Sequence, residues 1–123
     1  MNSGSPVSPG DGPAGARRVL LDECLPRRLR HAFLGHEVHT VQELGWAGTK
    51  NGALLGRAAA DGFAVFVTVD RNLEYQQHLP GVALAVLALR ARSNDVTDLL
   101  PLMPEVLAVL PTLAPGQVVR VPQ

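Results

Sequence analysis

The segment Val19-Leu20-Leu21-Asp22-Glu23 joins a short apolar run directly to two adjacent carboxylates. Two further continuous apolar runs lie at residues 64–67 and 83–89. Runs without polar alternation are typical of parallel strands that are covered by helices on both faces. Weaker runs at residues 37–41 and 117–121 predict strands nearer the edges of the same sheet.

Apolar residues at helical spacing fill the gaps between these runs. They predict helices over residues 25–33, 54–59, 71–78 and 99–110, of which the third is short. Pro104 removes a backbone hydrogen bond, so the last helix is expected to kink or to start late. The alternation of strands and helices predicts an α/β fold, a three-layer α/β/α sandwich with a mainly parallel central sheet.

Length and composition predict one domain with a core of its own. Residues 1–16 are nearly all Ser, Gly, Pro, Asn and Ala, so we expect a disordered N-terminal tail followed by a domain over residues 17–123. No apolar stretch has the length of a signal peptide core or a membrane span, so no membrane partner is expected. Cys24 is the single cysteine, which favours a reducing, cytoplasmic location.

Acidic residues follow two of the predicted central strands. Asp22 and Glu23 come after the first, and Asp70 follows the third. Glu43 and Glu74 are two further candidates for the same acidic group. The functional crevice of an open parallel sheet lies at the carboxyl ends of its strands. In a 2-1-3-4 strand order the first and third ends would be about 4.8 Å apart. Carboxylates at that separation repel one another, and Mg²⁺ or Mn²⁺ would relieve the repulsion.

A helix cap is the alternative explanation for these acids. Aspartate at a junction between a strand and a helix often accepts hydrogen bonds from the free amides of the first helical turn. Asp22 and Asp70 both lie at such predicted junctions. From the sequence, capping and metal binding both remain open for each of them.

Several motifs resemble those of a known family. The sequence LLDECLPRRL at residues 20–29 resembles the opening of the short PIN-like proteins, a domain family of unknown function within the PIN nuclease superfamily. TVDRNL at residues 68–73 resembles their third-strand motif, and the segments at 35–38, 41–45 and 48–51 are similar to their connecting segments. The resemblance runs from about residue 18 to residue 121.

The resemblance implies a PIN fold and a magnesium-dependent ribonuclease. It implies catalytic roles for Asp22, Glu23 and Asp70, and a metal site formed by these three with Asn72. Some relatives are toxins of toxin–antitoxin pairs, which implies an antitoxin protein as a partner. The chain departs from the family pattern at Asn51 and Asn72, where relatives commonly carry acids. Asparagine brings no charge and cannot act as a base, so catalysis depends on the remaining carboxylates.

Basic residues provide the candidates for RNA contact. Acidic and basic residues number eleven each, so net charge does not indicate a nucleic-acid binder. All basic residues except Lys50 are arginines, which suit bidentate phosphate contacts. A compositional bias or a solvated helix face would also explain them. The arginines predicted to contact RNA are Arg27, Arg30, Arg71, Arg90 and Arg92.

Three functions are consistent with these features. The first is a Mg²⁺- or Mn²⁺-dependent endoribonuclease with RNA as its substrate, for which an antitoxin protein and a second copy of the chain in a homodimer are expected partners. The second is a catalytically degenerate PIN-like module that binds RNA or a protein partner, which Asn51 and Asn72 favour. The third is a receiver-like phosphoacceptor. It is disfavoured because the single lysine, Lys50, lies in a predicted loop and none follows the late strands.

Overall fold

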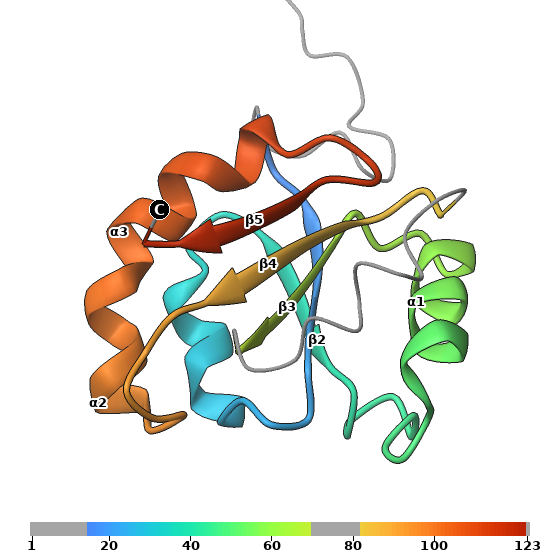
Figure 1. Cartoon of the computed structure of the whole chain (residues 1–123), viewed down its shortest axis with the longest axis horizontal. Coiled ribbons are helices and arrows are strands. Elements are labelled where there is room, and N and C mark those ends of the chain that lie inside the picture. Colours follow the sequence, from blue (N-terminus) through green and yellow to red (C-terminus); the bar gives the residue numbers. More distant parts are fainter. Residues whose placement is uncertain (1–14, 70–81, 123) are drawn as a thin grey trace, which may run out of the picture.

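A parallel β-sheet forms the centre of the domain (Figure 1). The computed structural model describes residues 15–69 and 82–122. Within them, five strands are arranged in the order β2-β1-β3-β4-β5, and every neighbouring pair is parallel. The strands are β1 (Arg18–Leu21), β2 (Glu37–Thr40), β3 (Val65–Val69), β4 (Ala85–Leu89) and β5 (Val118–Val121). The predicted fold class and the adjacency of the first and third strands are confirmed.

Burial along the strands explains their apolar character. All five residues of β3 and of β4 are buried, because these strands have neighbours on both sides and layers on both faces. The edge strands β2 and β5 are only partly buried, and each carries polar residues. The two weaker apolar runs therefore form the edges of the sheet, as predicted.

Helices cover both faces of this sheet. On one face α1 (Asn51–Ala60) packs with Trp46 and Phe63 against inward residues of the strands. The other face is covered by η1 (Arg27–Ala32), α2 (Val96–Leu99) and α3 (Met103–Val109). Figure 1 shows α1 on the opposite side of the sheet from α2 and α3. We call these the α1 face and the α3 face.

Proline divides the last helical region into short pieces. Two 3₁₀ segments, η3 (Leu100–Leu102) and η4 (Leu110–Thr112), flank α3, and each of the three elements has a proline in its first turn. Pro104 is tolerated there because the amide it lacks would have no partner inside the helix. The α-helix that contains Pro104 thus begins only at Met103, although helical structure begins at Val96, before the predicted start. The first predicted helix differs in type, since η1 is a 3₁₀ helix whose stripe still buries Leu29.

Two structural expectations fall on undescribed parts of the chain. The N-terminal tail over residues 1–16 and the short helix over residues 71–78 lie wholly or almost wholly outside the described residues. No helix among residues 15–69 and 82–122 is long and apolar enough to cross a membrane.

Candidate functional site

Asp22 lies at the carboxyl end of β1, where the backbone pairing with β3 continues. Its amide donates to the carbonyl of Val67 at 2.9 Å. Its side chain is buried, and the Thr68 hydroxyl of β3 donates to Oδ2 at 2.7 Å. The amide of Glu23 donates to Oδ1 at 2.8 Å. These bonds from β3 and from the following turn fix the orientation of the carboxylate.

The hydrogen bonds of Asp22 test the explanation that it caps a helix. Pro26, and not Asp22, is the N-cap residue of η1. The Asp22 carboxylate serves the turn that follows β1, through the Glu23 amide, and the strand beside it, through Thr68. A role as a helix cap is therefore excluded for Asp22. Asp70 lies outside the described residues, so the same alternative stays open for it.

Glu23 is oriented toward a different element. Its carboxylate Oε1 accepts a hydrogen bond of 3.0 Å from the amide of Gly48, in the loop between β2 and α1. Gln42 of the same loop donates to the Glu23 carbonyl at 2.9 Å. The side chain is exposed, unlike that of Asp22. The structure thus places the two neighbouring carboxylates against opposite neighbours of β1, one against β3 and the other on the β2 side.

A lateral row of side chains crosses the sheet from Asp22. The register places Thr68 of β3 opposite Ala88 of β4, and Ala88 opposite Arg120 of β5. Because Leu21 is paired with Val67, the next step places Asp22 beside Thr68, in agreement with their hydrogen bond. This row lies on the α1 face, since Leu20 and Phe66, two residues earlier in β1 and β3, pack against α1.

Sequence reasoning missed Thr68 and Arg120 as parts of this site. In the sequence, Thr68 only begins the motif TVDRNL after the apolar run 64–67, and Arg120 only lies within the predicted strand 117–121. A polar residue inside an otherwise apolar strand is the signal that could have identified them. Burying a hydroxyl without a partner is costly, so the buried Thr68 indicates a partner on the same face.

Cys24 is unsuited to act as a nucleophile. Its sulfur lies 3.5 Å from Oδ2 of Asp22 and 3.9 Å from the Thr68 hydroxyl. Burial, followed by the negative charge of Asp22, raises the pKa of the Cys24 thiol above its ordinary value. Since the thiolate is the reactive species, this environment keeps the sulfur protonated and unreactive.

The structure describes four of the five arginines that were predicted to contact RNA. Arg27 and Arg30 are exposed on η1, which packs on the α3 face, and Arg30 pairs with Glu43 at 3.3 Å. Arg90 and Arg92 follow β4, and Arg90 is next to the β5 backbone through a bond of 2.6 Å from its amide to the Val121 carbonyl. Arg71 lies outside the described residues. The four described arginines thus come from two segments, η1 and the residues after β4, and their contact with RNA stays a prediction.

Glu43 has a structural environment at the edge of the sheet. Its carboxylate accepts from the amide of Thr40 at 2.9 Å and lies 3.2 Å from Nδ1 of His39. His39 also contacts Glu37 at 2.8 Å through Nε2. Partial burial alone would raise the pKa of Glu43, but the bonds from Thr40 and His39 lower it. These contacts belong to a β2 polar cluster, which is separate from the Asp22 site.

Metal-ligating residues are sparse in the described part of the chain. No group of three or more His, Cys, Asp or Glu side chains is gathered closely enough there to hold a metal ion. Magnesium commonly uses one or two carboxylates and completes its shell with water. A carboxylate offers about four lone-pair positions, so Asp22 can share its oxygens between protein donors and a cation. The donor chemistry of Asp22 fits a hard divalent ion; Asp70 and Asn72 lie outside the described residues.

The sheet and the position of its acid define an α/β domain of PIN-like type. Residues 18–87 match the family model described as "PIN like domain", which is more than half of the 123 residues. The chain therefore belongs to the PIN-like domain family. No curated protein and no solved structure gives a significant match. Membership in this family points in general terms to a nuclease-type function and to divalent-metal dependence.

Proposed function

We propose that this chain is a Mg²⁺- or Mn²⁺-dependent endoribonuclease of PIN-like type. The observation that carries the proposal is the buried Asp22 carboxylate, fixed by Thr68 at the carboxyl ends of two central parallel strands. Ligand crevices of open α/β sheets lie at such ends. The family match adds the nuclease-type expectation.

In this proposal Asp22 and Asp70 hold the metal ion, with Asn72 and Glu23 as further oxygen ligands. The ion would supply Lewis-acid stabilisation of the phosphate charge and a more acidic water. Thr68 and the Glu23 amide keep the Asp22 carboxylate in one orientation, which reduces the reorganisation needed on binding. Glu23 would orient a water. Its exposed carboxylate would then give up its hydrogen bond from the Gly48 amide, or keep that bond on one oxygen and bind the water with the other.

The second candidate function is a degenerate module that binds RNA or a protein without cleavage. One feature favours it: the family resemblance implies acids at positions 51 and 72, where this chain has Asn51 and Asn72. The toxin role, the antitoxin partner and the homodimer stay predictions. Growth arrest on expression of the wild-type chain, relieved by Asp22→Asn, would support the toxin role.

A cleavage assay separates the two candidate functions. Purified wild type, Asp22→Asn, Asp70→Asn and Asp61→Asn would be incubated with single-stranded and hairpin RNA in Mg²⁺, Mn²⁺ or EDTA. Asp61 pairs with Arg18 at 3.2 Å next to the amino end of β1. Asp61→Asn is therefore the same chemical change at the opposite end of the strands from Asp22. We expect cleavage by the wild type and by Asp61→Asn with a divalent ion, and no cleavage in EDTA.

Asp22→Asn and Asp70→Asn are expected to lose at least a hundredfold in rate while retaining cooperative thermal unfolding. The order of magnitude is that of removing one group which stabilises charge in a transition state. A wild-type preparation that binds RNA but does not cleave it with Mn²⁺ would establish the binding module instead. Residual cleavage that is equal in all four proteins would identify a contaminating nuclease.

A further inference from the structure

The turn that follows β1 carries two of the candidate acids and leaves two of its carbonyl groups outside its own hydrogen bond. The amide of Leu25 donates to the Asp22 carbonyl at 3.0 Å, which closes a turn from Asp22 to Leu25. Glu23 and Cys24 are the central residues of this turn, so their carbonyl groups take no part in its closing bond. The placement of the turn therefore depends on what binds these two carbonyls.

A side-chain amide binds each of the two carbonyl groups. Gln42 Nε2 donates to the Glu23 carbonyl at 2.9 Å, and Asn94 Nδ2 donates to the Cys24 carbonyl at 2.8 Å. Gln42 lies in the loop after β2, and Asn94 lies in the loop after β4. In the sheet, β2 and β4 are on opposite sides of β1, so the turn is held from both sides. We call Gln42 and Asn94 the turn amides.

Both turn amides extend from anchored segments. Gln42 belongs to a loop whose Trp46 is buried in the core of the α1 face. Asn94 follows Ser93, whose hydroxyl oxygen accepts a hydrogen bond of 3.1 Å from the amide of Asp95. The loop backbones that carry the two donors are therefore fixed, and the turn is placed relative to both.

The turn amides act on Glu23 rather than on Asp22. Asp22 is placed independently of them, because its amide and its carboxylate bind Val67 and Thr68 of β3. Glu23 is exposed, and its carboxylate is bound by the Gly48 amide at 3.0 Å. A rotation of the turn would therefore displace the Glu23 side chain and leave the Asp22 carboxylate in place.

The donors are uncharged, which matters next to two carboxylates. A lysine or arginine in either place would bring a positive charge that competes with a divalent cation for the acids. The side-chain amide of glutamine or asparagine donates a hydrogen bond without such a charge. The turn amides therefore hold the acidic turn without reducing its negative charge.

We infer that Gln42 and Asn94 are positioning residues for the proposed ribonuclease reaction. Through the two carbonyls of the turn, they keep the Glu23 carboxylate at a fixed place relative to Asp22. The inference rests on the proposed function for the role of Glu23 in orienting a water. A displacement of about 1 Å can lower a rate roughly a hundredfold, so loss of one amide should lower kcat about ten- to a hundredfold. The KM for RNA should change by less than about twofold, because the amides bind the turn and not the RNA.

The first readout is the amide signal of Gly48 in an NMR spectrum recorded in EDTA. An amide proton that donates to a carboxylate resonates downfield of one that donates to a neutral group, so Glu23→Gln gives the position for the weakened bond. Gln42→Met and Asn94→Leu remove the donors, and each should move the Gly48 signal toward that position. Asn94 belongs to a different loop from Gly48, so a shift in Asn94→Leu is transmitted through the turn.

The second readout is cleavage of single-stranded RNA with Mn²⁺, together with the rise in melting temperature caused by Mg²⁺. In both variants kcat should fall while KM stays unchanged. The Mg²⁺ effect depends on Asp22, so it should equal that of the wild type. All rates are compared at a temperature at which thermal melts show each variant folded.

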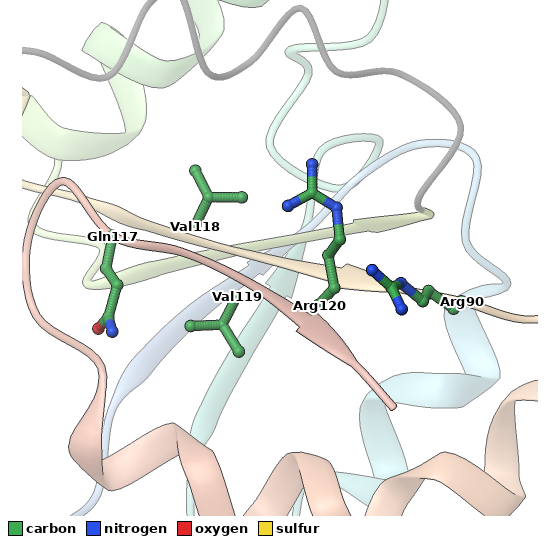
Figure 2. A pocket seen from close by; sticks show the side chains of 5 residues that line it. All are labelled: Arg90, Gln117, Val118, Val119 and Arg120. Atoms are coloured by element: carbon green, nitrogen blue, oxygen red, sulfur yellow. The ribbon is translucent and has the colours of Figure 1, made fainter. Parts of the chain in front are cut away.

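Gln117→Met is the matched control. Gln117 is an exposed glutamine whose Oε1 accepts from the amide of Ala114 at 2.9 Å. It lines a pocket at the amino end of β5, at the far end of that strand from Arg120 (Figure 2). The control variant loses a local hydrogen bond of the same kind, and it should keep the wild-type kcat and the wild-type Gly48 signal.

The failures of the two proposals are distinguishable. If the Gly48 signal moves in both variants and the wild type does not cleave RNA, the effect of the turn amides on Glu23 is supported and the nuclease is contradicted. If the wild type cleaves and both variants keep its kcat and its Gly48 signal, the inference is wrong and the nuclease stands. A raised KM with unchanged kcat would make Gln42 and Asn94 RNA contacts, and an abolished Mg²⁺ effect would make them supports of the metal site. Either of these two results overturns the inference.

Discussion

The hydroxyl of Thr68 donates a buried hydrogen bond of 2.7 Å to Oδ2 of Asp22, and so connects the ends of β3 and β1. The backbone does the same one residue earlier, through the bond from the Asp22 amide to the Val67 carbonyl. The side-chain bond therefore extends the ladder of the sheet by one step. It makes the orientation of the acid a property of the strand pairing rather than of a loop.

Thr68→Val tests this connection. The substitution keeps the shape of the side chain but removes a donor from a buried carboxylate, so the free energy of unfolding should fall by about 1–3 kcal/mol. Urea denaturation measures the loss. Thr97→Val, at an exposed position of α2, is the control and should stay within about 0.5 kcal/mol of wild type. Equal effects of the two variants would mean that the Asp22–Thr68 bond contributes no stability.

Asp22→Asn should abolish stabilisation by magnesium. For a dissociation constant on the order of 1 mM, 10 mM Mg²⁺ stabilises the wild type by roughly 1.4 kcal/mol, which raises the melting temperature by several degrees. The variant lacks the charge that attracts the ion, so its melting temperature should be the same in Mg²⁺ and in EDTA. Asp61→Asn should respond like the wild type. A magnesium shift of the same size in Asp22→Asn would remove Asp22 from the metal site.

His39 should make stability depend on pH. Partial burial lowers its pKa, but the contacts with Glu37 and Glu43 outweigh this and raise the pKa of His39 above its ordinary value. The folded protein thus holds the proton more tightly than the unfolded chain. The stabilisation is complete below about pH 6.5, the ordinary histidine value, and is lost as the pH rises through the raised pKa of the folded state.

Urea denaturation of wild type and His39→Gln between pH 5.5 and 8.5 measures this dependence. The difference in unfolding free energy should be largest at the acid end and shrink toward pH 8.5. His36 provides a control of opposite sign, because burial and then the charge of Arg17 lower its pKa. The stability that neutral His36 contributes is lost as the pH falls. The His36→Gln variant should therefore lose less unfolding free energy than the wild type between neutral and acid pH. A pH-independent effect of His39→Gln would show that the imidazole is not protonated in the contact.

Two glycines of the α1 region should respond to alanine in opposite directions. Gly62 ends the helix with φ +89°, a conformation that L side chains rarely adopt. Gly62→Ala should therefore destabilise the protein by roughly 1–2 kcal/mol. Gly56 lies inside α1 with no atom within 4 Å of an added Cβ, and Gly56→Ala should stabilise by roughly 0.5–1 kcal/mol. Thermal melts of the pair test the assigned end of α1; effects of the same sign would contradict it.

The central strands were predictable because burial of a parallel strand on both faces leaves a continuous apolar run in the sequence. The runs at residues 64–67 and 83–89 gave two central strands with their ends misplaced by up to two residues. The 3₁₀ geometry of η1 was not predictable. Its apolar stripe is equally compatible with an α-helix, and its residues Leu29 and Phe33 reach the core of the α3 face from the 3₁₀ segment.

The candidate site was predictable only in part. Asp22 could be placed because it directly follows a strand, and the topology then determines its position. The direction of the Glu23 side chain depends on the Gly48 amide, which belongs to a loop distant in sequence. Arg120 was missed because a single charged residue in a short strand carries no motif. Its significance depends on the register with Ala88, a property of the folded sheet.

The position of Arg120 within β5 also protects the sheet against mispairing. A shift of β5 by one residue would turn every side chain to the other face. Arg120 would then face the apolar layer beneath α3, where Val119 and Val121 now pack. Burying a guanidinium there is strongly unfavourable, so Arg120 adds to the packing of Val119 and Val121 in disfavouring the shifted alignment. An Arg120→Leu variant should lose this discrimination and, as an edge strand without a charge, become more prone to aggregate.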